Sequence, residues 1–316
     1  MPKTGVVNSK NPQKTSKAKV KPTKPKLDIK IKPRYVLPNV WQLSKKCLWV
    51  IWKYRWALSG IVLIYGVVNF VIVQGFNSGF NVSSLKSQLD SIFHGQYYQI
   101  TSGLTIYALM LTSFGSASAS SSGGGFGLQL FFGVMASLAI IWAVRNALNG
   151  ARFRIRDAYY NGMYPLIQFV IVLIIIGVQL LPMVAGISIY ALAVNNNIAI
   201  TGLEKSGFII AMLALSSLTL YWISSSAFAL YIVTLPNMSP IKAMRSAKKL
   251  VKGRRWAVLL RMLYLPLMLL IISSVIMVPA IILVSALAQW LFLILSLVLL
   301  VVFHSYLYNL YRELLE

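Results

Sequence analysis

The sequence predicts an all-α integral membrane protein with six transmembrane helices, and three observations carry this prediction. First, 58% of the 316 residues are hydrophobic and only 11% are charged, whereas soluble domains carry about 25% charged residues. Second, the apolar residues form six stretches with at most one charged residue each, long enough to cross a hydrocarbon core of about 30 Å. Third, 30 basic residues outnumber six acidic ones, and they gather on one side of these stretches.

Residues 1–35 are predicted to form a disordered basic tail ahead of the membrane domain, residues 36–316. The tail is rich in lysine and proline and poor in apolar residues, so it cannot bury enough surface to offset the entropy of ordering. It is either a solvated cytoplasmic tail or a segment that attaches electrostatically to anionic lipid or to a protein partner. Nucleic acid is a less favoured partner, because no aromatic residue precedes Tyr35 and base stacking needs aromatic rings.

Residues 36–55 mix tryptophan and lysine, which is the composition of a membrane interface. The first predicted span follows at residues 56–76. Between residues 77 and 125 we expect a short surface helix, a half-inserted hairpin and a flexible Gly/Ser linker. The hairpin is not counted as a span, because one more crossing would move the most basic loops to the outer side.

Five further spans are predicted, with bends expected at Pro182 and at Pro266 or Pro279. With this assignment 28 of the 30 basic residues lie on one side, and only Lys86 and Lys205 lie on the other. The positive-inside rule then places both termini in the cytoplasm, and the expected location is a plasma membrane. The five spans are residues 126–144, 165–190, 208–235, 258–283 and 290–311.

A basic amphipathic helix is predicted between spans four and five. Ser239 can cap its first N–H groups, Pro240 suits the first helical position, and Gly253 can end it. A helix of this kind lies on an anionic membrane surface. Its cations either contact lipid or a protein partner, or they only set the topology. The apolar positions are Ile241, Met244, Ala247 and Val251, and the candidate contact residues are Lys242, Arg245, Lys249, Lys252, Arg254 and Arg255.

A weak internal repeat relates the starts of spans one and five. Residues 53–58 align with residues 253–258, and both contain Arg-Trp-Ala where a basic interfacial stretch joins a span. A less similar copy, residues 154–165, precedes span three. Three units of one interfacial helix and two spans would each begin and end on the inner side, so they would be parallel repeats about the membrane normal. An identity of three residues can also arise by chance.

The stretch at residues 229–256 resembles one family of bacterial membrane proteins. It contains Ala-Leu-Tyr-Ile-Val-Thr-Leu-Pro at residues 229–236, Ser-Pro at 239–240 and Gly-Arg-Arg-Trp at 253–256. These motifs resemble the uncharacterised six-span integral membrane proteins related to the membrane domain attached to some glycerophosphodiester phosphodiesterases. The resemblance covers about residues 36–312 and implies six helices with interfacial linkers. It implies no established activity, because no phosphodiesterase domain accompanies the membrane region in this chain.

No catalytic, cofactor or metal site is predicted, and the chain is not expected to be an enzyme. Metal-dependent hydrolysis needs several Asp, Glu and His side chains around one ion, and the chain has only six acids and two histidines. His94, one turn after Asp90, is expected on a solvated helix face. His304 is an ionisable group within span six and therefore a functional candidate, although a neutral histidine hydrogen-bonded between helices is the favoured interpretation.

The leading functional hypothesis is a non-enzymatic membrane protein that engages anionic lipids or a protein partner at its cytoplasmic face. Eight cations within 20 residues, at positions 242–261, motivate it. The alternative is a transporter, or an accessory subunit of one, for a neutral or lipid-like solute. Its pathway would use polar residues of the spans, which helix packing also explains. They are Asn69, Gln74, Gln179, Ser216, Ser217 and Gln289.

Overall fold

The computed structural model describes residues 39–73, 124–151, 153–196 and 201–315, and the regular structure within these ranges is helical. The predicted basic tail, the surface helix and hairpin expected in residues 77–123, and the candidate residue His94 lie outside the described residues.

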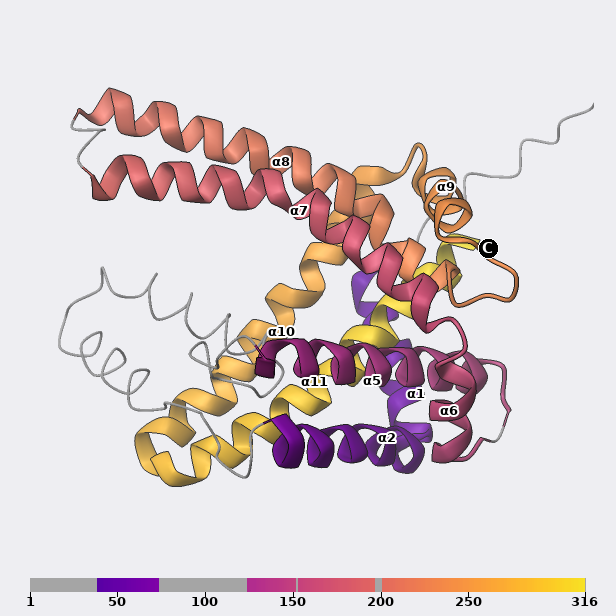
Figure 1. The fold of residues 1–316 in the computed structure, drawn as a ribbon. Helices are drawn as coiled ribbons and strands as arrows, with labels where there is room; N and C mark the ends of the chain where they lie inside the picture. The colour runs from indigo at the N-terminus through magenta and orange to yellow at the C-terminus, as the bar shows by residue number, and fades with distance from the viewer. Residues whose placement is uncertain (1–38, 74–123, 152, 197–200, 316) are drawn as a thin grey trace, which may run out of the picture. The chain divides into compact units, whose positions relative to one another are not determined.

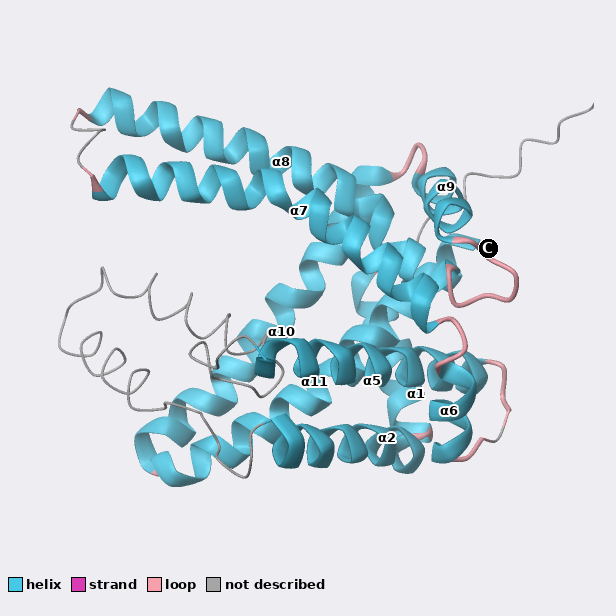
Figure 2. Cartoon of the chain, in the orientation of Figure 1, coloured by secondary structure: helices cyan, strands magenta, loops and turns pink. Residues whose placement is uncertain are grey.

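Among the described residues, three connecting helices each precede a pair of spans (Figure 1), and Figure 2 shows the described loops and turns between helices. The connecting helices are α1 (Val40–Lys53), α6 (Ile155–Gly162) and α9 (Pro240–Val251). A π-helical segment, η1 (Asn69–Val73), extends the first span. The pairs are α2 (Arg55–Val68) with α5 (Gly124–Leu148), α7 (Leu166–Asn195) with α8 (Gly202–Ile232), and α10 (Arg255–Leu283) with α11 (Ser285–Leu315).

Six helical segments among the described residues are long and apolar enough to cross a membrane. They lie over the six stretches expected from the sequence, so the predicted all-α fold with six spans is confirmed. The chain is a multi-pass membrane protein. The segments are Arg55–Val73, Gly127–Leu148, Leu166–Val194, Gly202–Ile232, Arg255–Leu283 and Trp290–Leu315.

Capping groups extend some spans beyond their uncharged stretches. Helix α8 begins at Gly202 and not at the predicted residue 208. The Thr201 hydroxyl accepts a hydrogen bond from the Glu204 backbone N–H at 3.3 Å, and the Glu204 carboxylate accepts one from the Thr201 N–H at 3.1 Å. This capping box satisfies the first free N–H groups of the helix, so the charged first turn stays helical. A count of uncharged residues misses such a turn.

Helix α9 begins and ends at the predicted residues, and most of its predicted apolar face is buried. The Ser239 hydroxyl accepts from the Lys242 N–H at 3.4 Å, and Gly253 has a positive φ of 82° just after the helix. Ala247 and Val251 are buried in one core with residues of α8, and Met244 packs against that core. Ile241 is instead 63% exposed, and Ala243 is buried. Only the first predicted apolar position is therefore wrong, because the small Ala243 side chain permits the closest approach between helices.

Each connecting helix packs against the last span of the pair before it. Helix α6 lies against α5, and α9 lies against α8. Helix α1 has no span before it, and it packs against α11, the last span of the chain. Within each pair the two spans also contact one another, most extensively α7 and α8, which run side by side (Figure 1). The described connecting helices and spans therefore form a closed series of contacts, in which the last span contacts the first connecting helix.

Helices α5 and α11 lie at the centre of the described structure. Both contribute side chains to each of the two buried clusters, one formed mainly with α8, α9 and α10 and the other with α2 and α6. In the most apolar 18-residue stretch of α5 and of α11, 44% and 50% of the residues are buried, compared with 11% in α7 and 6% in α8. The surfaces of α7 and α8 therefore face lipid along most of their length.

We predict that Gly162→Ala destabilises the protein. A Cβ atom at this position would lie 3.2 Å from both Cα of Ala139 and the carbonyl oxygen of Leu138, which are backbone atoms that cannot rotate away. Overpacking of this kind costs about 1–3 kcal/mol, and it should lower the midpoint of thermal unfolding in detergent. The matched control is Gly177→Ala, because no atom lies within 4 Å of a Cβ at Gly177. Equal midpoints for the two variants would contradict the close contact of α5 and α6.

Candidate functional site

The candidate site lies at the end of the spans where α5, α8 and α11 finish and α2, α7 and α10 begin, here called the basic end. Arginines tie the finishing helices together. Arg145 of α5 donates through Nη1 to the Thr234 carbonyl at 3.0 Å and through Nη2 to the Thr234 hydroxyl, just after α8. Arg312 of α11 donates to the Leu148 carbonyl of α5 at 3.2 Å. Cations suit this position because helix C-termini carry partial negative charge.

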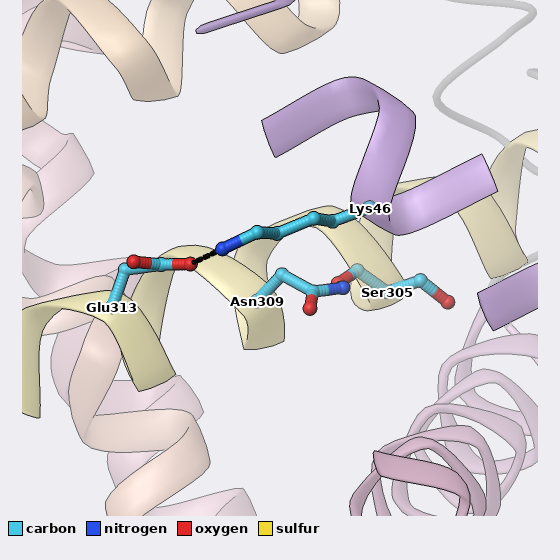
Figure 3. A network of polar contacts seen from close by, with 4 residues as sticks. All are labelled: Lys46, Ser305, Asn309 and Glu313. Atoms are coloured by element: carbon cyan, nitrogen blue, oxygen red, sulfur yellow. Dashed lines mark hydrogen bonds and ion pairs between the residues drawn. The ribbon is translucent and has the colours of Figure 1, made fainter. Parts of the chain in front are cut away.

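A pocket of about 530 Å³ opens at the basic end between α1, α5 and α11. An ion pair joins Lys46 of α1 to Glu313 of α11 across it (Figure 3). Glu313 is 6% exposed, and the Lys46 side chain is 57% exposed. The pocket lining carries three cations and one carboxylate, so its net charge is positive and suits an anionic group. The lining residues are Lys45, Lys46, Trp49, Val50, Leu148, Asn309, Arg312 and Glu313.

The ion pair holds α1 on α11 together with an apolar stripe. Leu43, Cys47 and Val50 are at most 2% exposed, and the Cys47 Sγ atom lies 3.8 Å from the Val302 carbonyl oxygen of α11. Burial raises the pKa of the Cys47 thiol to about 12, because a thiolate loses its hydration there. Helix α1 therefore presents cations to the pocket with one face and packs on α11 with another.

The α9 cations divide into an exposed group and a partly buried pair. Lys242, Arg245, Lys249 and Lys252 are exposed, as is Lys248. Arg254 and Arg255 are half-buried, and the Arg255 guanidinium carbon lies 4.3 Å from the centroid of the Tyr221 ring of α8. That stacked arginine stabilises the contact of α10 with α8. The exposed group, Lys242 to Lys252, is the part of the predicted set that is open to a ligand.

The carboxylates of the described residues have partners other than this exposed group. Asp157 accepts from the backbone N–H of Arg154 at the start of α6, at 3.1 Å. Glu204 caps α8 at the opposite end of the span, and Glu313 pairs with Lys46. No ion pair joins a carboxylate to an α9 cation within the part of the chain that the structure describes. The exposed cations of α9 are therefore available to an anionic ligand.

His304 bridges three spans. Its Nε2 atom lies 3.0 Å from the Ser137 hydroxyl of α5, and its Nδ1 atom lies 3.3 Å from the Tyr231 hydroxyl of α8. Both ring nitrogens thus have partners, and His304 is 8% exposed. A serine and a histidine at this distance can form a nucleophile and base pair, but neither residue lines a described pocket. The geometry is that of a histidine hydrogen-bonded between helices.

Two of the other polar residues of the spans bond to residues three or four positions earlier in the chain. Asn69 donates to the Tyr65 hydroxyl at 3.3 Å, and the Ser217 hydroxyl donates to the Ala214 carbonyl of its own turn at 2.8 Å. Gln179 and Ser216 line neither described pocket, and the side chain of Gln289 lies outside the described set. The transporter pathway stays a prediction. No cluster of three His, Cys, Asp or Glu residues occurs among the described positions.

The pocket between α1 and α11 is not predicted from the sequence. Residues 36–55 are predicted only as a membrane interface, and Arg312 and Glu313 lie beyond the last predicted span. The hydrogen-bond partners of His304 are also not predicted. The sequence signal that could have indicated the pocket is Glu313 directly after an apolar span, since a carboxylate that is buried there needs a cationic partner.

Comparison of the chain with protein-family models, with curated proteins and with solved structures gives no match. The resemblance to the six-span bacterial membrane proteins stays a prediction, and the candidate site depends on the geometry described above.

We predict that Lys46→Met loosens α1 and exposes Cys47. At pH 9 a free thiol of pKa about 8.5 is mostly thiolate and alkylates rapidly, whereas the buried Cys47 thiol of pKa about 12 stays protonated. Removing Lys46, which pairs with the buried Glu313 carboxylate, should lower the stability of the contact between α1 and α11 by on the order of 1–2 kcal/mol. The value is modest since the pair is partly solvated. The rate of iodoacetamide labelling should rise about tenfold, because local opening exposes the thiol more often.

The control for this experiment is Lys45→Met, which removes an exposed neighbouring charge and should leave the labelling rate near that of the parent protein. Lys46→Met combined with Glu313→Gln should recover part of the protection, because the buried carboxylate is then neutral. Equal labelling of all variants and the parent protein would show that the ion pair does not hold α1 in place.

We predict that the hydrogen bonds of His304 stabilise the packing of α5, α8 and α11. Ser137→Ala and Tyr231→Phe should each lower the free energy of unfolding by about 1 kcal/mol, the usual net value of a hydrogen bond. His304→Leu should cost more, because it removes both bonds. Ser217→Ala serves as the control, since that hydroxyl is exposed and bonds to its own turn. Thermal midpoints that match the parent protein for all three core variants would contradict this role.

Proposed function

We propose that this membrane protein binds anionic phospholipid head groups at its basic end and that it acts without catalysing a reaction. The observation that carries the proposal is the exposed group of cations on α9, from Lys242 to Lys252, together with the absence of an ion-paired carboxylate for them among the described residues. Lipid phosphates at a membrane surface are the nearest abundant counter-charge for cations at the end of a span.

Exposed aromatic side chains support a position at the lipid head groups. Trp56 at the start of α2 is 81% exposed, and Trp256 at the start of α10 is 77% exposed. The Arg55 guanidinium carbon lies 5.0 Å from the Trp52 ring centroid. Tryptophan and arginine together are typical of the interfacial region, where the ring meets acyl chains and the cation meets phosphate. These side chains support a position of the basic end at the depth of the lipid head groups.

The orientation of the protein follows from the same charges. Residues 3–55, 145–156 and 242–261, together with Arg312, carry 28 of the 30 basic residues, and basic segments near spans remain on the cytoplasmic side. We propose that both termini and the basic end lie in the cytoplasm of a bacterial cell, where the inner leaflet supplies anionic lipid.

We predict that the triple variant Lys242→Gln, Lys249→Gln and Lys252→Gln retains less anionic lipid. Each surface lysine contributes about 1 kcal/mol of attraction to an anionic membrane, so the ratio of phosphatidylglycerol to phosphatidylcholine that purifies with the protein should fall about tenfold or more. Mass spectrometry of the lipids extracted with the full chain measures this ratio. The control is Lys205→Gln, because this exposed lysine lies at the opposite end of α8.

An unchanged lipid ratio in a triple variant that unfolds at the same temperature as the parent protein would show that these lysines only set the topology. A protein that purifies in stoichiometric amount with the parent chain, but not with the triple variant, would instead assign the exposed cations to a protein partner.

A further inference from the structure

An apolar groove of about 490 Å³ runs along the contact between α2 and α11. Its floor is formed by buried side chains, since Leu58, Val62 and Val301 are at most 6% exposed. Its walls are open to the surroundings, because Leu63 is 62% exposed and Ile294 is 57% exposed. The groove is therefore a concave strip on the surface of two spans, separate from the pocket lined by Lys46 and Glu313.

A glycine allows the two helices to meet along the floor. A Cβ atom at Gly66 would lie 2.7 Å from the Leu297 Cδ1 atom, which is closer than such atoms approach in proteins. With hydrogen at this position, Leu297 of α11 packs directly on the backbone of α2. A larger residue would separate the helices and open the floor.

The two ends of the groove differ chemically. At the end away from the basic end, the rings of Phe70 and Trp290 contact one another with centroids 5.6 Å apart. At the basic end the lining includes Arg55, whose guanidinium carbon lies within 5.7 Å of two ring centroids, Trp52 and Trp56. The Ser59 hydroxyl between them donates to the Trp56 carbonyl of its own turn at 3.2 Å. A cation thus marks one end, and the remaining length is apolar.

A groove with a cation at one end and apolar side chains along the rest matches a phospholipid. Fifteen helical residues separate Arg55 from Phe70, so the groove extends about 22 Å into a hydrocarbon core of about 30 Å. A phospholipid places its anionic phosphate at the interface and its acyl chain along that direction. Arginine binds phosphate with two parallel N–H groups. A helix from a second copy would fill the apolar part, but it would leave the interfacial arginine without an anionic partner.

We propose that the groove between α2 and α11 holds one acyl chain of an anionic phospholipid whose phosphate binds Arg55. This inference rests on the proposed function, because it assigns a fixed position to one of the lipids that the basic end attracts. The exposed cations of α9 bind head groups that exchange with the bilayer, whereas the groove retains one lipid.

The test is photolabelling of the full chain in phosphatidylcholine vesicles that contain a trace of phosphatidylglycerol carrying a diazirine in one acyl chain. The matched probe is phosphatidylcholine with the same labelled chain. Peptide mapping should place phosphatidylglycerol labels in residues 59–70 and 290–301 about fivefold above the phosphatidylcholine probe, the factor expected for one cation at the surface. Arg55→Gln should make labelling by the two probes equal.

Leu63→Trp fills the groove from its wall and should reduce labelling of these peptides by about fivefold, whereas Val275→Trp should not. Val275 is 68% exposed on α10 and does not line the groove. Equal labelling by both probes in the parent protein, or labelling that Leu63→Trp leaves unchanged, overturns the proposal. A crosslink that shows another protein segment in the groove overturns it as well. The lipid ratio retained by the α9 triple variant is independent of the groove, so it still decides the proposed function.

Discussion

Polar side chains on the C-terminal part of α11 hold the described helices together. A hydrocarbon environment offers no water, so each such group needs a partner from a neighbouring helix. His304 contacts Ser137 and Tyr231, and Glu313 pairs with Lys46. The Tyr306 hydroxyl adds a bond to the Arg261 carbonyl of α10 at 3.1 Å. Helix α11 thus bonds to α1, α5, α8 and α10, and the positions of the basic side chains around it depend on these contacts.

The contacts of the connecting helices with the spans are relevant to the proposed internal repeat. If three units of one connecting helix and two spans were arranged about one axis, each connecting helix would meet the last span of the unit before it. The packing of α6 on α5, α9 on α8 and α1 on α11 has this order. Within the aligned residues 53–58 and 253–258, Trp56 and Trp256 are both exposed, and Leu58 and Val258 are both buried. The arginines differ, since Arg55 is exposed and Arg255 is half-buried. These observations support the repeat as a proposal.

The sequence predicted the features that depend on neighbouring residues. Uncharged stretches located the six spans, and Ser239 with Gly253 located the ends of α9. Contacts between distant residues could not be predicted in this way. Lys46 and Glu313 are 267 positions apart, and Ser137 and His304 are 167 apart, so their meeting depends on how each span is rotated. Helical periodicity identified three of the four apolar positions of α9. It ranked the exposed Ile241 above the buried Ala243, because it does not consider that close packing favours the smaller side chain.

Unequal span lengths give the protein an unequal fit to its bilayer. The segment Arg55–Val73 has 19 residues, or about 28 Å of helix, which matches a hydrocarbon core of about 30 Å. Helices α7 and α8 have 30 and 31 residues, or about 45 Å each. Their apolar, lipid-facing hairpin must tilt, extend beyond the core or thicken the membrane around it. Such an adjustment is needed along α7 and α8, and along α10 with its 29 residues, but not along α2. A change in lipid chain length will therefore act unequally on the spans.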